Sequence, residues 1–302
     1  LRTHVLATIA LGYASSSQGL LDFFSRTFFA HQQELYLLEG HLDKIVELLL
    51  REGLCEDRGG LLEPTPFGRR ACELYIDPLS AVTLRDGLFK AREVKTSAIS
   101  YLQLIAALPE IRGLYLRARD YEPCTKEALE NESRLLLPAP SQLSEPWRYE
   151  EFLAQMKTAL LLRDWIDEHG EDFILEKYSI GPGDLRNKID LADWLLYASI
   201  EVGRLFRLEK MGEIMALRKR VKYGVREELL ELVSLRGIGR VRARRLYARG
   251  FRTLEDLRKA EVREIARVEL VGEKLAEKIK NQLGGGGEEK GREEYQSSLT
   301  DF

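Results

Sequence analysis

The sequence predicts a mainly α-helical protein with a small N-terminal domain, a central helical bundle, a small C-terminal helical domain and a flexible tail. Apolar residues recur at helical spacing through most of the 302 residues. Only one short stretch, around Gly59 and Gly60, has the pattern of two paired strands. Two segments interrupt the helices: a loop rich in proline and serine at 137–146, and four consecutive glycines at 284–287, which cannot hold a helix.

The first domain, residues 1–80, has the element order of a winged helix. Three serines precede a helix predicted over Leu20 to Phe29, and they can cap it. Two short extended pieces then flank Gly59-Gly60, and Thr65 caps a further helix with Pro66 in its first turn. Winged helices bind DNA or only make protein contacts. Because this one is not basic, we favour a structural role.

The second domain, residues 81–217, is predicted to be a helical bundle. A long helix expected over 149–169 has its apolar residues on one face. Another is predicted to begin with Asp184 as its N-cap and to run past Arg204. At about 100° per residue, its apolar residues form one stripe for burial. The stripe consists of Leu185, Ile189, Ala192, Leu196, Ile200 and Gly203.

Trp194 lies on the polar face of that helix, roughly 180° from Leu185 at helical spacing. A tryptophan on a polar face needs an explanation. Either a neighbouring helix covers it, or it stacks on a base of a single-stranded nucleic acid while Arg186 holds a phosphate.

The third domain, residues 218–284, carries the strongest local motif, a helix-hairpin-helix from Leu235 to Tyr247. Gly237 and Gly239 permit a tight turn whose amides, with the next helix N-terminus, can face a phosphate. A degenerate second copy at Leu270–Ala276 keeps one glycine of the pair, Gly272. Positive charge beside the predicted turn comes from Arg240, Arg242, Arg244 and Arg245. Such hairpins bind the DNA backbone with little sequence choice, although a purely structural helical hairpin is the alternative.

The charge distribution supports a polyanionic partner for the third domain. The chain has a net charge of −3, yet residues 218–284 hold 19 lysines and arginines against 10 aspartates and glutamates. A basic domain on an acidic body is typical of nucleic-acid binding, although a solvated charged surface would have the same composition.

The tail, residues 285–302, is expected to be unstructured and ends in a possible partner motif. Gln296, Leu299 and Phe302 have the spacing Q-x-x-L-x-x-F, which suits a hydrophobic pocket on a partner. The alternative is an inert tail.

Several classes are not supported by the sequence. We expect no membrane span and no signal peptide, and the three cysteines (Cys55, Cys72 and Cys124) fit a reducing cytoplasm. No P-loop, no nucleophile elbow and no metal-ligand pattern is present, so we expect no catalytic residue, cofactor or metal site in this chain.

Three segments together resemble a known family. They are Thr65–Arg70 leading to Leu74–Ser80, Tyr178–Arg186 leading to Trp194, and Leu235–Tyr247. In these segments, and over essentially its full length, the chain resembles the C-terminal part of the archaeal superfamily 2 DNA helicases of the Hjm type. These are relatives of the eukaryotic HELQ and theta-polymerase helicase regions.

The resemblance implies a winged helix, a seven-helix ratchet bundle and a helix-hairpin-helix domain that follow two RecA-like ATPase domains using ATP and Mg²⁺. It implies an ATP-dependent 3′→5′ helicase acting on single-stranded and forked DNA, with Arg186 and Trp194 on the ratchet helix. Whether Arg186 or Lys188 holds the phosphate stays open. It also implies that Arg242 and Arg244 brake the motor and that the tail binds a sliding clamp.

Two other classes remain as alternatives. One is a non-enzymatic repair scaffold that binds DNA and a sliding clamp. The other is the processing subunit of a structure-specific nuclease, which no carboxylate cluster supports.

Overall fold

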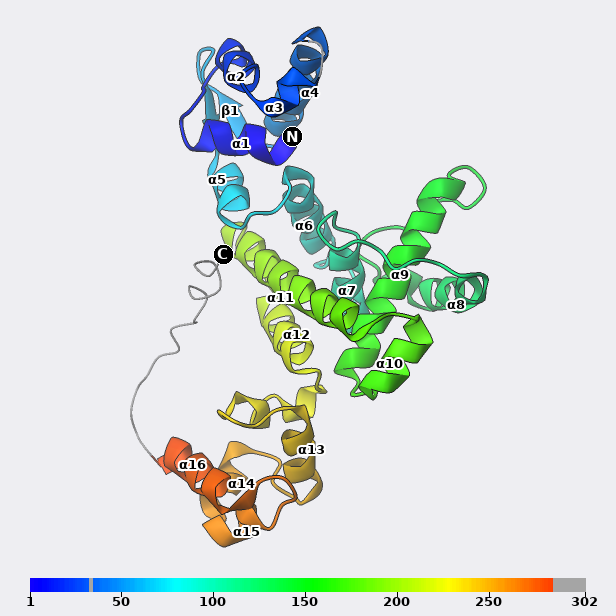
Figure 1. Ribbon diagram of the computed structural model, residues 1–302, viewed down its shortest axis with the longest axis vertical. Helices are drawn as coiled ribbons and strands as arrows, with labels where there is room; N and C mark the ends of the chain where they lie inside the picture. The colour runs from blue at the N-terminus through cyan, green and yellow to red at the C-terminus, as the bar shows by residue number, and fades with distance from the viewer. Residues whose placement is uncertain (33–34, 285–302) are drawn as a thin grey trace. The chain divides into compact units, whose positions relative to one another are not determined.

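The computed structural model describes residues 1–32 and 35–284, and the chain divides into two compact units, Leu1–Gly224 and a second that begins at Val225 (Figure 1). Both units are helical, which confirms the predicted mainly-α fold class. The domain boundaries at 80 and 217 stay predictions, since the first unit encloses residue 80 and α12 (Met211–Tyr223) runs through residue 217.

The N-terminal part of the first unit is built from short helices around a two-stranded hairpin. Strands β1 (Cys55–Asp57) and β2 (Leu62–Pro64) pair antiparallel, with Glu56 opposite Glu63. The predicted hairpin is therefore confirmed. Its helices are α1 (Arg2–Ala10), α2 (Ser17–Phe24), α3 (Phe28–His31), α4 (Leu35–Arg51) and α5 (Pro66–Glu73).

The caps of this part follow the sequence, with one correction. Thr65 accepts a hydrogen bond from the Gly68 amide, and Pro66 occupies the first turn of α5, as predicted. Helix α2, however, ends at Phe24 and not at Phe29. The Thr27 hydroxyl donates to the Phe24 carbonyl at the end of α2, and Thr27 is itself the N-cap of α3, which begins at Phe28.

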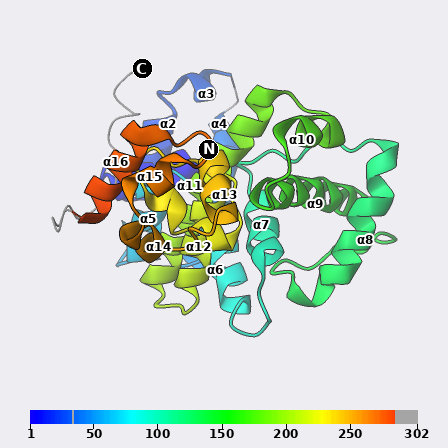
Figure 2. The same cartoon turned by 90° about the horizontal axis from the view of Figure 1, so that it is seen from below.

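Seven α-helices follow, and every residue of this stretch is described. They are α6 (Pro78–Lys90), α7 (Ala98–Ala106), α8 (Tyr121–Asn131), α9 (Pro146–Ile166), α10 (Glu171–Tyr178), α11 (Pro182–Leu205) and α12. Helix α9 is central, with α7, α8, α10 and α12 packed against it (Figures 1 and 2). It ends at Ile166, three residues before the predicted end.

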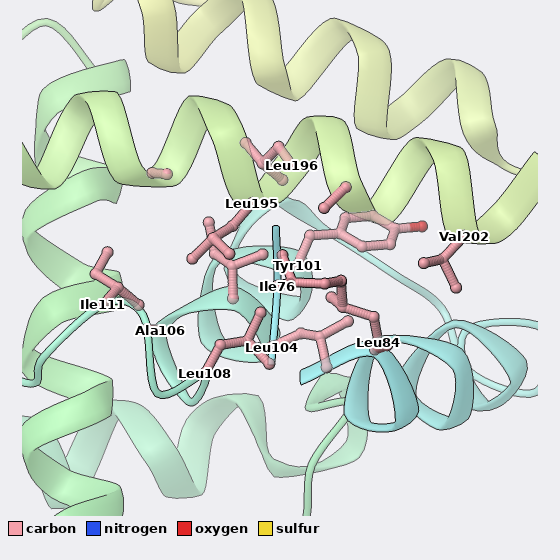
Figure 3. Close-up of a cluster of buried hydrophobic side chains, with 14 of the residues drawn as sticks. Ile76, Leu84, Tyr101, Leu104, Ala106, Leu108, Ile111, Leu195, Leu196 and Val202 are labelled. Atoms are coloured by element: carbon pink, nitrogen blue, oxygen red, sulfur yellow. The ribbon is translucent and has the colours of Figure 1, made fainter. Parts of the chain in front are cut away.

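Helix α11 forms one wall of the core. Its apolar stripe is buried as predicted, and Leu195 and Val202 face side chains from α6 and α7 (Figure 3). The helix begins earlier than expected: Gly181 is its N-cap, and Asp184 is the third helical residue. Pro182 fixes the first turn, and the Asp184 carboxylate accepts a hydrogen bond from the Gly181 amide at 3.1 Å. The prediction of Asp184 as N-cap was wrong.

The second unit is a compact set of short helices. Two 3₁₀ turns, η3 (Glu227–Leu229) and η4 (Leu232–Ser234), precede α13 (Arg240–Ala248), α14 (Leu254–Lys259), α15 (Val262–Ala266) and α16 (Gly272–Gly284). Gln296, Leu299 and Phe302, the predicted clamp-binding residues, lie outside the described residues.

Candidate nucleic-acid interface

The second unit contains two hairpins of the same design. One connects η4 to α13, and the other connects α15 to α16. Gly237 has φ +86° in the first hairpin, and Leu270 has φ +67° at the matching place in the second. A leucine in this left-handed region is unusual because its Cβ crowds the following carbonyl. Both hairpins therefore have a left-handed residue at this position, although only the first has the glycine that it favours. The following glycine differs, since Gly239 is extended and Gly272 has φ +59°.

The two hairpins also share the pattern of their buried residues. Each buries apolar side chains at matching positions before, within and after the turn. The pairs are Leu235 and Val268, Ile238 and Val271, Ala243 and Ala276, and Leu246 and Ile279. The degenerate second copy seen in the sequence is thus a structural duplicate.

The first hairpin presents a helix N-terminus that can receive an anion. Gly239 is the N-cap of α13, and the first-turn amides of a helix point along its axis without acceptors inside the helix. Arg240 follows the cap directly and is half-buried. The partial positive charge of the N-terminus and this arginine favour a phosphate at the turn.

The remaining predicted arginines are exposed or half-buried, and each has a partner within the unit. Arg242 ties the two hairpins together, since it donates to the Gly237 carbonyl at 2.9 Å and to the Leu270 carbonyl at 2.8 Å. Arg244 pairs with Glu228 at 2.9 Å, and Arg245 pairs with Glu269 at 3.2 Å. Exposed ion pairs of this kind are weak. A phosphate can therefore replace the carboxylates, whereas Arg242 has a structural role in the turn.

In the first unit, the two candidate phosphate-binding residues of α11 differ in their exposure to solvent. Arg186 is exposed and donates to Asp190 at 3.0 Å. Lys188 is buried and donates its Nζ proton to the Arg112 carbonyl. Burial lowers the pKa of Lys188, because it disfavours the charged ammonium. Of the two residues, only Arg186 is placed to meet a phosphate.

Trp194 is neither fully covered nor fully exposed. Its ring is half-buried and packs against the core, and its indole N–H donates to the Leu74 carbonyl at 3.1 Å. The Leu74 carbonyl lies at the end of α5, so this end of the helix adjoins the ring, and the stacking of Trp194 on a base stays a prediction. The exposed remainder is held in one orientation by the hydrogen bond.

One residue beside Trp194 was missed by the sequence analysis. Tyr75 follows the carbonyl that anchors Trp194, and it has φ +58° with 80% of its surface exposed. It occupies the position after a helix end where glycine is preferred, so its backbone is strained and its ring gains little from burial. An aromatic residue just before an Ile-Asp-Pro helix start was the available signal.

A second missed feature is the ionic bracing of α11. Arg218 on α12 donates to Asp193 at 3.0 and 3.3 Å, and its guanidinium lies 4.9 Å from the Tyr197 ring centroid. Glu201 on α11 pairs with Arg70 on α5 at 3.2 Å. These contacts fix the face of α11 that carries Trp194 to its neighbours.

Two family models match this chain. "Archaeal helicase, domain 4" covers residues 99–224, and "SAM-like Helix-hairpin-helix tandem" covers residues 229–284. Proteins named ATP-dependent DNA helicase Hel308 are similar over nearly the full chain. Those from Methanocella arvoryzae and Thermococcus kodakarensis are 37% and 41% identical, each over 94% of this chain. That from Pyrobaculum calidifontis is 40% identical over 93%. The chain corresponds to the C-terminal part of a Hel308-type helicase.

This chain covers less than half the length of each of these relatives. This chain spans 38% of the Methanocella protein, 25% of the Thermococcus protein and 39% of the Pyrobaculum protein. The Hel308-type region contains the candidate residues of both units, from Arg186 and Trp194 on α11 to the hairpins of the second unit. The tandem match confirms the predicted helix-hairpin-helix fold of residues 229–284.

In 1–32 and 35–284, no three or more His, Cys, Asp and Glu side chains gather as a metal site would require. Over the same residues, no helix has the length and apolar character of a membrane span.

Proposed function

We propose that this chain is the DNA-handling part of an ATP-dependent 3′→5′ DNA helicase that acts on single-stranded and forked DNA. The arrangement that supports this most strongly is a braced helix, α11, that holds Trp194 half-exposed with Arg186 two turns away. The ring offers a face for a base, and the guanidinium offers a charge for the backbone. Tyr75, which follows the Leu74 carbonyl in the chain, would supply a second exposed aromatic ring.

The second unit would hold the same strand by its phosphates. The turn at Gly237–Gly239 and the N-terminus of α13 provide amides, and Arg240, Arg244 and Arg245 provide charge. Contacts of this kind carry no base information, so a strand of any sequence can pass. This property suits an enzyme that must move along DNA.

The motor itself would come from RecA-like domains elsewhere in the parent protein, which would bind ATP and Mg²⁺. Opening and closing of those domains would step bases past Trp194. A sliding clamp would be bound by the tail residues Gln296, Leu299 and Phe302. The adaptor alternative is not favoured, because the relatives are named helicases.

Titration of the chain with fluorescent oligothymidylate at several salt concentrations tests the proposal. We expect tight binding at low salt that weakens as salt rises, with a logarithmic slope of about −0.7 per phosphate contact. Arg186→Ala and Arg245→Ala should each reduce the slope by about one contact. The chain alone should hydrolyse no ATP. Absence of single-strand binding at low salt, or ATP hydrolysis by this chain, would refute the proposal.

A further inference from the structure

The segment that joins α7 to α8 has no regular structure over 112–117 and ends in a 3₁₀ turn, η1 (Ala118–Asp120). Buried polar side chains bind its backbone. Lys157 on α9 donates to the Tyr115 carbonyl at 2.8 Å, and the Thr158 hydroxyl accepts the Leu114 amide at 3.0 Å. Lys188 on α11 donates to the Arg112 carbonyl. Lysines are rarely buried unless paired. Two buried lysines donate to carbonyls of this one loop. The fold therefore fixes the position of the loop backbone.

Along this backbone, side chains point alternately into the core and toward solvent. Leu114 and Leu116 are buried in the core, whereas Tyr115 and Arg117 face solvent. Tyr115 is 83% exposed, so its ring adds almost nothing to the core. We call residues 112–119 the arginine loop.

The arginine loop is strongly cationic. It contains Arg112, Arg117 and Arg119, all exposed, and no acidic residue. Throughout the described part of the chain, no carboxylate lies within ion-pair distance of Arg112 or Arg117, although most other arginines of the first unit are paired. Asp120, which follows the loop, is buried and paired with Lys157 at 2.6 Å. The charge of the loop is therefore not neutralised locally.

The arginine loop adjoins the start of α11. Arg119 donates to the Ser179 hydroxyl at 2.6 Å, just before that helix, and Lys188 reaches the loop from within it. A groove of about 740 Å³ adjoins the loop, and its lining includes Arg112, Tyr115 and Arg117 of the loop together with Glu150 and Glu151 of α9. A backbone of phosphates would follow the arginines, away from the two carboxylates.

We propose that the arginine loop is a second single-strand contact of this protein, in which Tyr115 stacks on a base and Arg112 and Arg117 bind the flanking phosphates. It continues the path that begins at Trp194 and Arg186. This inference rests on the proposed function, since it assumes the same ligand. An exposed aromatic residue between unpaired arginines is the pattern by which proteins bind single strands without sequence preference.

The test measures binding of oligothymidylates of about 4 to about 16 nucleotides by the 302-residue chain. Tyr115→Ala should weaken binding of the longest strand about 5- to 100-fold with an unchanged salt slope. Arg112→Ala/Arg117→Ala should reduce the slope by about 1.4. Binding of the shortest strand should change much less. Such a strand is too short to reach both α11 and the arginine loop, so it can still bind at α11.

Tyr13→Ala is the matched control, since Tyr13 is 69% exposed and lies on the N-terminal part of the same unit. It should bind every strand as the parent does. If both arginine-loop variants bind the longest strand like the parent while Arg186→Ala weakens it, the inference is wrong and the proposed function stands. If the parent binds no single strand, both are wrong. Circular dichroism of each variant separates lost binding from lost folding.

Discussion

Replacing Lys157 by Met should destabilise the first unit and disturb the arginine loop together. The Lys157 ammonium donates to Asp120 at 2.6 Å and to the Tyr115 carbonyl at 2.8 Å, with only 4% of its side chain exposed. Breaking a buried pair by removing one partner typically costs about 3–5 kcal/mol, because the other charge stays buried.

The ability of Asp120 to bind a proton limits this cost. From an ordinary pKa of about 3.9, protonation at pH 7 costs about 4 kcal/mol, so the electrostatic penalty cannot exceed that value. The amide of Arg117 still donates to the carboxylate at 2.8 Å and compensates in part. We therefore expect a loss of about 3 kcal/mol at pH 7.

The loss should depend on pH in a defined direction. Burial opposes ionisation of Asp120, but hydrogen bonds from Lys157 and the Arg117 amide outweigh it and hold its pKa below the usual value. A carboxyl with a depressed folded-state pKa stabilises the fold above its unfolded pKa, and this stability is lost as the pH falls through the folded value. In Lys157→Met the penalty should accordingly shrink to about 1 kcal/mol near pH 4.

Urea denaturation followed by circular dichroism at pH 7 and near pH 4 measures both quantities. Arg148→Met is the control, since the Arg148–Glu145 pair is exposed and should contribute less than about 1 kcal/mol. A Lys157→Met loss below about 1 kcal/mol at pH 7, or an equal loss at both pH values, would show that the pair does not act as described.

The other predictions concern Tyr75 and Gly237, two left-handed residues of the candidate nucleic-acid interface. Tyr75→Gly removes backbone strain and an exposed ring. The free energy of unfolding should stay within about 1 kcal/mol of the parent, while oligothymidylate binding weakens about fivefold or more. A large loss of stability with unchanged binding would show that Tyr75 has a structural role instead. Gly237→Ala places a Cβ at φ +86° and 3.1 Å from Leu275, so the second unit should lose about 1–2 kcal/mol in thermal unfolding. Gly212→Ala, which has open space, should cost nothing; equal Tm values for the two glycine variants would contradict the role of Gly237.

Local patterns predicted the parts of the fold that depend on neighbouring residues. The hairpin at Gly59-Gly60, the Thr65 cap and the buried stripe of α11 follow from turn chemistry and helical period, and the structure has all three. The paired hairpins of the second unit follow from a repeat visible in the sequence.

Long-range contacts account for what the sequence analysis missed. Trp194 is on the polar side of α11 by periodicity, and the carbonyl that anchors it belongs to Leu74, 120 residues earlier. Lys157 and Lys188 would be placed at the surface by any hydropathy pattern, and only the folded bundle brings them to the carbonyls of the arginine loop. Tyr115 lies outside the helices, in a stretch too short for its alternation of buried and exposed residues to stand out in the sequence.

Binding of fluorescent oligothymidylate by Trp194→Ala, compared with Trp147→Ala, tests the central claim most directly. Both residues are tryptophans of the first unit, and Trp147 is 83% exposed at the start of α9. We expect Trp194→Ala to raise the Kd about 5- to 100-fold while Trp147→Ala leaves it unchanged. Equal Kd values for the folded Trp194→Ala variant and the parent would show that α11 is no part of a single-strand path.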